Sequence, residues 1–370
     1  MSWKSMAIFK IFDRTRDFST HSMCLIVPAY TSLFLIFGPH GIWSAFYWIL
    51  PLWLTVLLDT YGGSELRCAS SNSAGWPFNS LLYILAALQI INFVLLLEMA
   101  FQLQWNTKSE IIISLVNLYA IKVICGTSSS FSGIVVAHEI IHRRQWYMKC
   151  IGRFLLSLML YEHFFTEHIR GHHRNFGTAD DPATARFGES FESFWRRTVP
   201  GQFRHAWQLE NKRLGYNGEL NLRIIQHRVM QGVCFEILLL CAVTWFYGVV
   251  GVVAFLINTF AAVRKLEAVN YIEHWGLSRE NRGLNAALSW DTDSWFTLHT
   301  LVGLSRHADH HSRASKPYQK LCCTKESPKL PCGYFGSVYL TMTRNKRFQK
   351  LAIEELKRRR LGPYQGLSAR

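Results

Sequence analysis

Long apolar runs constrain the fold of this chain more than any other feature of its sequence. Six runs approach the roughly 20 residues that a helix needs to cross the hydrocarbon core of a bilayer. They cover residues 22–37, 42–58, 81–101, 111–137, 229–247 and 252–269. Hydrophobic residues make up 49% of the chain. We therefore predict an all-α integral membrane protein with about six transmembrane helices.

The runs also set the predicted domain organisation. Residues 1–21 are expected to form a polar N-terminal segment on the cytoplasmic side, residues 22–345 one membrane domain, and residues 346–370 a basic C-terminal tail. An apolar piece at 151–160 is too short to span a bilayer, so we expect it to be buried or interfacial. No cleavable signal peptide is evident, because the first apolar run lacks a small-residue cleavage site.

The chain carries a formal charge of +15, and no RNA- or DNA-binding motif accompanies it. Basic residues follow the fourth run and fill the C-terminal region, whereas the loop between the third and fourth runs carries only Lys108. The positive-inside bias places the basic side in the cytoplasm. This predicts a multi-pass protein of the inner membrane in a bacterium, or of the endoplasmic reticulum in a eukaryote.

Nine cysteines are scattered along the chain without a CxxC pair. The absence of that pair argues against a zinc ribbon or a fused rubredoxin-like iron site. Several of the cysteines lie in apolar runs, so we expect reduced thiols packed as small hydrophobic side chains.

Histidines cluster where apolar runs meet the predicted cytoplasmic side. HEIIH and EHIRGHH repeat a four-residue spacing that puts two rings on one face of a helix, and RHADHH and NYIEHWG follow later in the chain. These clusters contain nine of the chain's fifteen histidines: His138, His142, His168, His172, His173, His274, His307, His310 and His311.

HEIIH alone matches the zinc-protease pattern, but such a site needs three protein ligands and would leave six clustered histidines unexplained. Nine imidazoles are enough to ligate two metal ions, and imidazole suits zinc, copper and iron. The membrane setting and the nitrogen-rich set favour a cytoplasmic non-haem di-iron site that activates oxygen. One acidic residue stands beside a histidine in each cluster, and these are predicted to orient the ligands: Glu139, Glu167, Glu273 and Asp309.

The other six histidines are given ordinary structural roles. His21, His40, His205 and His227 lie outside the clusters and are expected at the surface, and His163 and His299 lack cluster spacing. Trp48 and Trp53 in the second run are either part of a substrate channel wall or interfacial anchors, with the anchoring role favoured.

The motifs together resemble the membrane-bound alkane 1-monooxygenases of the fatty acid desaturase superfamily. That pattern runs HExxHK/R, EHxxGHH, NYxEHYGL and LQRHSDHHxxPxRxYQxL, and this chain has HEIIHR, EHIRGHH, NYIEHWGL and LSRHADHHSRASKPYQKL. The resemblance covers about residues 22–345. It departs from the pattern at Trp275, Ser305, Ala314 and Lys316, and none of these positions is a histidine.

The resemblance implies that the nine histidines hold two non-haem iron ions. It also implies insertion of one oxygen atom of O2 into the terminal methyl of an alkane or similar chain, with electrons from NAD(P)H through a reductase and a rubredoxin-type or other small carrier. The adjacent pair His172 and His173 is expected to face two different irons. Besides the carrier, the expected partners are an alkyl substrate and membrane lipid, with no nucleic acid.

Two rival functions remain open at this stage. A fatty-acyl desaturase or hydroxylase could be built on the same scaffold, and would form a double bond or an internal hydroxyl instead of a terminal alcohol. A non-catalytic membrane protein that stores or senses metal would bind the ions without consuming O2.

Overall fold

The structure is a computed structural model that describes residues 15–68, 75–216, 222–279 and 288–365. The predicted N-terminal segment and basic tail thus lie partly outside the described residues. Across the described part of the chain the regular structure is helical, apart from two isolated β-bridges. The longer helices are α2 (Ile26–Ile36), α3 (Ile42–Ile49), α4 (Pro51–Tyr61), α5 (Gly75–Phe101), α6 (Lys108–Ser128), α7 (Val135–Ile141), α8 (Trp146–Ser157), α11 (Phe191–Leu214), α12 (Arg228–His274), α15 (Tyr334–Thr343) and α16 (Asn345–Arg359).

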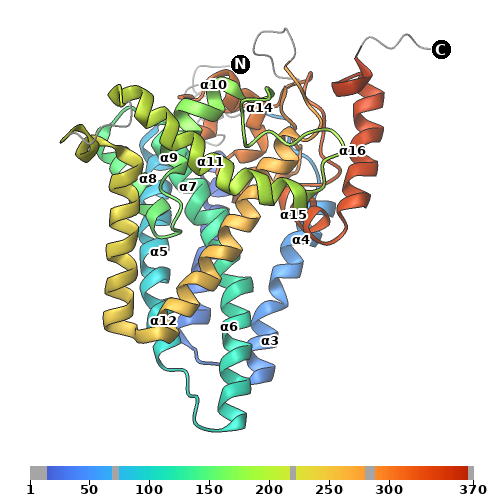
Figure 1. The fold of residues 1–370 in the computed structure, drawn as a ribbon. Helices are drawn as coiled ribbons and strands as arrows, with labels where there is room; N and C mark the ends of the chain where they lie inside the picture. Colours follow the sequence, from blue (N-terminus) through green and yellow to red (C-terminus); the bar gives the residue numbers. More distant parts are fainter. Residues whose placement is uncertain (1–14, 69–74, 217–221, 280–287, 366–370) are drawn as a thin grey trace, which may run out of the picture.

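Five helices are long and apolar enough to cross a membrane, and they contain all six predicted runs. They cover Thr15–Ile36, Ile42–Tyr61, Gly75–Phe101, Lys108–Ile141 and Arg228–His274. The last of these is α12, which turns back on itself so that its two arms hold the fifth and sixth runs (Figure 1). The turn is at Gly248, whose φ of 62° and ψ of −164° belong to a region that only glycine adopts readily.

The fourth run contains a local change of helix type that the sequence did not predict. After α6, the segment η2 (Ser129–Ile134) is a π-helix, and α7 then resumes the α-helix. Its Ser129 hydroxyl links Gln89 of α5 to Asn258 of α12, with distances of 3.2 Å to each. A π-bulge inserts extra backbone into a helix and is frequent at functional sites. Here it precedes the helix that carries His138.

The short apolar piece forms α8, and its burial confirms the prediction. Leu155 and Leu156 are 1% and 0% exposed, and α8 packs against α7. Shorter elements complete this end of the bundle: α9 (Phe164–Glu167), the π-helix η3 (His168–His172), α10 (His173–Asn175), α13 (Trp295–Thr300), and α14 (His307–Ser312). They gather at one end of the long helices, as Figure 1 shows, and we call this end the cap.

The basic segment after residue 345 is packed into the cap over most of its described length. It forms α16, which buries Phe348, Ala352 and Leu356. The Phe348 ring lies 5.8 Å from the ring of Tyr271, near the C-terminal end of α12. The basic residues of α16 therefore occupy the outer face of a helix that is part of the folded domain.

The prediction that all cysteines are reduced is wrong for two of them, because Cys68 and Cys322 form a disulfide. These residues are 254 positions apart in sequence, so no local pattern could pair them. Cys24 and Cys125 are buried thiols, as expected, whereas Cys150, Cys234 and Cys241 are exposed on their helices.

A buried carboxylate fastens the second membrane helix to the cap. Asp59 near the end of α4 accepts hydrogen bonds from the hydroxyls of Ser294 and Thr297 and from the backbone N–H of Gly336. It is only 4% exposed. Buried donors are costly to leave without an acceptor, so this cluster joins α4, α13 and α15 firmly.

We predict that Asp59→Ala will destabilise the protein by about 3 kcal/mol or more, because three buried donors lose their acceptor. Gly333→Ala should do the same, since a Cβ there would lie 1.8 Å from Asp59 Oδ1. Thermal unfolding in detergent measures both effects. Gly41→Ala is the matched control, because a Cβ at Gly41 meets no atom within 4 Å. Equal unfolding temperatures for all three variants would contradict the role of Asp59.

Candidate metal centre

The cap brings the nine clustered histidines together in two groups. Within each group the possible ligand atoms all lie within 4.8 Å of one another. We call these groups site A, with His138, His142, His168, His173 and His310, and site B, with His172, His274, His307 and His311. Both sites draw on segments far apart in the chain: the end of α7, the η3 region and α14 supply site A, and η3, the end of α12 and α14 supply site B.

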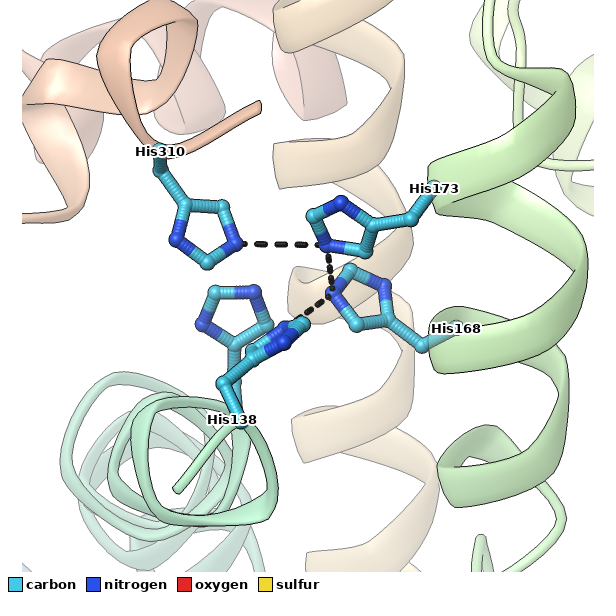
Figure 2. A group of neighbouring side chains, drawn as sticks. His138, His168, His173 and His310 are labelled. Carbon is cyan, nitrogen blue, oxygen red and sulfur yellow. Dashed lines mark hydrogen bonds between the residues drawn. The ribbon is translucent and has the colours of Figure 1, made fainter. Parts of the chain in front are cut away.

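Site A has the spacing expected of ligands around one ion. Nε2 of His168 lies 3.1 Å from Nε2 of His142 and 3.0 Å from Nε2 of His173. Nε2 of His310 lies 3.3 Å from that of His173 (Figure 2). Two nitrogens that bind one metal ion at about 2.1 Å are separated by about 3 Å. The buried Nε2 of His138 has no hydrogen-bond partner, which leaves it available as a further ligand.

Site B is more deeply buried and has an acidic neighbour. Nε2 of His311 lies 2.9 Å from Nε2 of His307, and Nε2 of His274 is buried without a partner. His274 is fully buried at the end of α12. Glu273 Oε2 approaches Nε2 of His307 at 3.2 Å. Four imidazoles and a nearby carboxylate fit a hard or borderline transition metal better than a soft one.

The adjacent pair His172 and His173 divides between the two groups, an arrangement in which each residue faces a different site. His173 belongs to site A and His172 to site B. The pair lies where the π-helix η3 passes into α10. Gly171 just before it is required by close packing, because a Cβ there would lie 2.7 Å from His205 Cε1 and 2.8 Å from Glu167 Oε1.

Burial keeps most of these imidazoles neutral, which is the form that binds metal. It lowers the pKa well below the usual value, and the charges of neighbouring histidines lower it further, for His142, His168, His173, His307, His310 and His311. His172 differs. Burial is the largest single influence and lowers its pKa, but the carboxylates of Asp181, Glu167 and Glu273 together raise that pKa above the usual value.

Asp181 is a site residue that the sequence did not reveal. Its Oδ2 lies 2.9 Å from Nδ1 of His172 and accepts a hydrogen bond from the Thr184 hydroxyl at 2.6 Å. The carboxylate is fully buried. This contact fixes the tautomer of His172 and turns its Nε2 toward the other site B ligands. Its position nine residues after His172, outside any histidine motif, gave no signal.

The four acidic residues chosen from the sequence have different surroundings, and of these only Glu273 contacts a site histidine through its side chain. Glu167 Oε1 lies 3.1 Å from His205 Nδ1. Glu139 binds the Arg143 guanidinium at 2.6 Å and the backbone N–H of Tyr318. Asp309 binds Lys316 and the backbone N–H of Cys322, so it anchors the segment after α14.

The expectation of surface positions was wrong for three of the remaining histidines. His21, His40 and His227 are 5%, 5% and 2% exposed. His40 shows the reason, because its Nε2 lies 2.8 Å from the carbonyl oxygen of Phe34 and its ring stacks on the Phe34 ring. His205 is partly exposed and contacts Glu167. His163 and His299 lie outside both sites.

A narrow cavity of about 20 Å³ with mostly apolar walls adjoins both sites. His138 and His168 of site A line it, as do His307 of site B and Glu273. Its other walls are mostly apolar side chains from η2, α7, α9 and α12: Phe131, Ile134, Val135, Phe164, Leu266, Val269 and Leu304, with Ser130 and Asn270. Neither Trp48 nor Trp53 lines it, and Trp53 is 48% exposed on α4.

Comparison with known sequences places the chain in a family. Residues 114–322 match the sequence model of the family described as "Fatty acid desaturase". The matched stretch is more than half of the chain and contains all nine site histidines. The chain belongs to the fatty acid desaturase family. Three helices long enough to span a membrane lie before the matched stretch: Thr15–Ile36, Ile42–Tyr61 and Gly75–Phe101.

Several curated relatives of this desaturase-family chain are monooxygenases. It is 38% identical over 223 residues to alkane 1-monooxygenase 1 of Pseudomonas aeruginosa, an alignment that covers 59% of the chain and 58% of the relative. It is 36% identical over 217 residues to alkane 1-monooxygenase 2 of Alcanivorax borkumensis, covering 56% of each. The xylene/toluene monooxygenase hydroxylase component XylM of Pseudomonas putida is 22% identical over 53% of each chain. The chain thus spans little more than half the length of these relatives.

Proposed function

We propose that this chain is a membrane-bound non-haem di-iron monooxygenase that hydroxylates the terminal methyl of an alkane or a related alkyl chain. The observation that carries the proposal is the pair of buried histidine groups beside a small cavity with mostly apolar walls, which histidines of both groups line. The similarity to alkane 1-monooxygenases supports the reaction class.

In this proposal the five histidines of site A and the four of site B each hold one iron. When bound, the two irons supply oxygen activation and the transfer of one oxygen atom to carbon. The residues of the chain itself form the surroundings of the substrate. Phe131, Ile134 and Val269 line the cavity beside the histidines, where they exclude water and offer an apolar surface to the end of the alkyl chain.

We place the cap on the cytoplasmic side, with six crossings if each arm of α12 counts as one. The short connections at the far end carry few basic residues, whereas the cap carries many. One observation opposes this orientation. Cys322 donates its backbone N–H to Asp309 of α14, so the Cys68–Cys322 disulfide lies on the cap side, and the cytosol keeps most thiols reduced.

Electrons are proposed to enter at site A from a rubredoxin-type or other small carrier supplied by an NAD(P)H reductase. His142 and His173 are the partly exposed members of the two sites. Arg144 and Arg174 are exposed nearby in sequence, and an acidic carrier would be attracted to them. Arg143 and Arg170 are less available, because they pair with Glu139 and Glu210 at 2.6 and 2.5 Å.

Product analysis tests the proposal against its nearest rival, a fatty-acyl desaturase or hydroxylase, which the family description favours. Purified protein loaded with iron is given O2, a surrogate reductant and a mixed panel of alkanes and fatty acids. Terminal alcohols are expected. Double bonds or internal hydroxyls would instead assign the rival function, and bound iron without reductant-dependent O2 uptake would indicate a metal-binding protein.

A further inference from the structure

Two lysines lie inside membrane-spanning helices without an acidic partner. Lys122 is exposed on α6, and Lys265 is partly exposed on the second arm of α12. Neither forms an ion pair or a side-chain hydrogen bond within the part of the chain that the structure describes. The neighbouring Arg264, in contrast, pairs with Glu192 at 2.8 Å. A charged residue within a membrane span usually marks a functional site with a specific partner.

Lys265 reaches the part of α6 that carries Lys122. A Cβ at Gly126 would lie 3.5 Å from Lys265 Nζ and 2.5 Å from the Cβ of Ala261. The missing side chain at Gly126 therefore lets α12 pack closely and lets Lys265 lie against α6. Gly126 is four residues after Lys122, so both lie on the same face of α6. The two lysines thus lie at the same contact between α6 and α12, and no acidic side chain of the described residues pairs with either.

Their depth matches the headgroup boundary on the cap side. The 21 residues from Lys108 to Ser128 make a helical length of about 31 Å, close to the thickness of the hydrocarbon core. Measured from Lys108 at the far side, the cap-side boundary therefore falls near Ser128, and the helix continues beyond it through η2 and α7. Gly126, which Lys265 Nζ approaches, is about 3 Å from the boundary, and Lys122 is about 9 Å from it. A lysine side chain is long enough to extend its charge from there toward the headgroups.

An apolar groove begins at Lys122 and runs toward the far side of the bilayer. It is about 600 Å³ in volume and lies between α6 and α12. Its walls are Leu115, Leu118 and Tyr119 of α6 and Val253, Leu256, Ile257 and Phe260 of α12. These residues precede Lys122 on α6 and Lys265 on the second arm of α12, so the groove lies on the hydrocarbon side of both charges.

We propose that this groove binds one anionic phospholipid of the cap-side leaflet, with its phosphate between Lys122 and Lys265 and one acyl chain along the groove. Basic pockets between membrane helices at the headgroup level recognise anionic lipids. The order of the features, charge at the boundary and apolar walls below it, matches the order of head and tail in such a lipid. The site is separate from sites A and B, and the inference does not depend on the proposed reaction.

Native mass spectrometry of the full-length protein tests this with phosphatidylglycerol and phosphatidylcholine as probes. Lys122→Met with Lys265→Met keeps most of the side-chain packing and removes both charges. Each lysine near the headgroups contributes about fivefold to binding, so the double variant should bind phosphatidylglycerol about 30-fold more weakly. Phosphatidylcholine binding should not change. The control is Lys346→Met with Lys350→Met, two exposed lysines of α16, which removes the same total charge.

Two tryptophan variants test the groove while leaving its charges in place. Leu115→Trp fills the groove and should also weaken phosphatidylglycerol binding, whereas Ile112→Trp, one turn earlier and outside the groove walls, should not. The proposal would be overturned if the Lys122/Lys265 variant bound phosphatidylglycerol as tightly as the unmodified protein does. It would also be overturned if the α16 control lost phosphatidylglycerol binding to the same extent. Oleate serves as a third probe, for a free fatty acid. If the Lys122/Lys265 variant loses oleate binding but retains phosphatidylglycerol binding, the site belongs to a free fatty acid and the proposal is overturned.

Discussion

His274→Ala should abolish hydroxylation and lower the iron content toward one ion per chain, while the protein stays inserted in the membrane. His274 is the last residue of α12 and is fully buried in site B. Within the described residues its Nε2 has no hydrogen-bond partner, and His274 belongs to the group of four histidines whose possible ligand atoms lie within 4.8 Å of one another. Removing it leaves site B with three imidazoles and a cavity where the fourth stood. A site that loses one of four ligands holds its ion far more weakly.

Iron analysis, oxygen uptake and product formation measure the effect of this substitution. The matched control is His299→Ala, which also removes a mostly buried histidine of the cap but lies outside both sites. The control should keep its iron and most of its activity. Full activity in the His274→Ala variant would refute the nine-ligand arrangement. Equal loss of iron in both variants would mean that the cap as a whole had become unstable.

The membrane helices and the histidine sites could be predicted because each depends on a short-range pattern. An apolar run is long enough to span a bilayer regardless of what surrounds it. A histidine pair four residues apart shares a helix face. Two of the clusters follow apolar runs and the other two lie in the polar regions beside them, so all four were expected at one end of the bundle. The division of His172 and His173 between two sites also followed from adjacency in the chain.

Features that depend on tertiary contacts could not be predicted in this way. Cys68 and Cys322 meet only because the loop after α4 and the segment after α14 fold together. Asp59 looks like any polar residue at a helix end, yet its partners lie more than 230 positions later. His40 was assigned to the surface because its partner, a backbone carbonyl of Phe34, has no signature in sequence.

The choice of acidic residues near the metal shows the same limit. Glu139 and Asp309 stand next to site histidines in sequence, but side chains of neighbouring residues on a helix diverge by about 100°. Glu139 therefore faces Arg143 and the backbone of Tyr318. Asp181 lies in an irregular segment that folds back over η3, and only the folded chain places it against His172.

Asp181→Asn is expected to weaken metal binding at site B by 10- to 100-fold, the usual effect of losing a carboxylate that orients a histidine ligand. The carboxylate accepts from Nδ1 of His172 and leaves Nε2 free to face the ion. Asparagine has no negative charge, and its amide nitrogen cannot accept that proton. The tautomer of His172 is then no longer fixed.

Iron retained against chelators of increasing strength measures this change, and Glu139→Gln is its control. Glutamine at 139 can still accept from the Tyr318 N–H, and the Glu139 side chain contacts no site histidine in the described structure. The control should therefore keep iron within about twofold of the unmodified protein. If Glu139→Gln loses iron and Asp181→Asn does not, the proposed role of Asp181 is wrong. Glu139, which is adjacent to His138 in sequence, would then be the residue that orients the ligands. Loss confined to one ion in Asp181→Asn is the specific outcome, because Asp181 contacts His172 of site B and no histidine of site A.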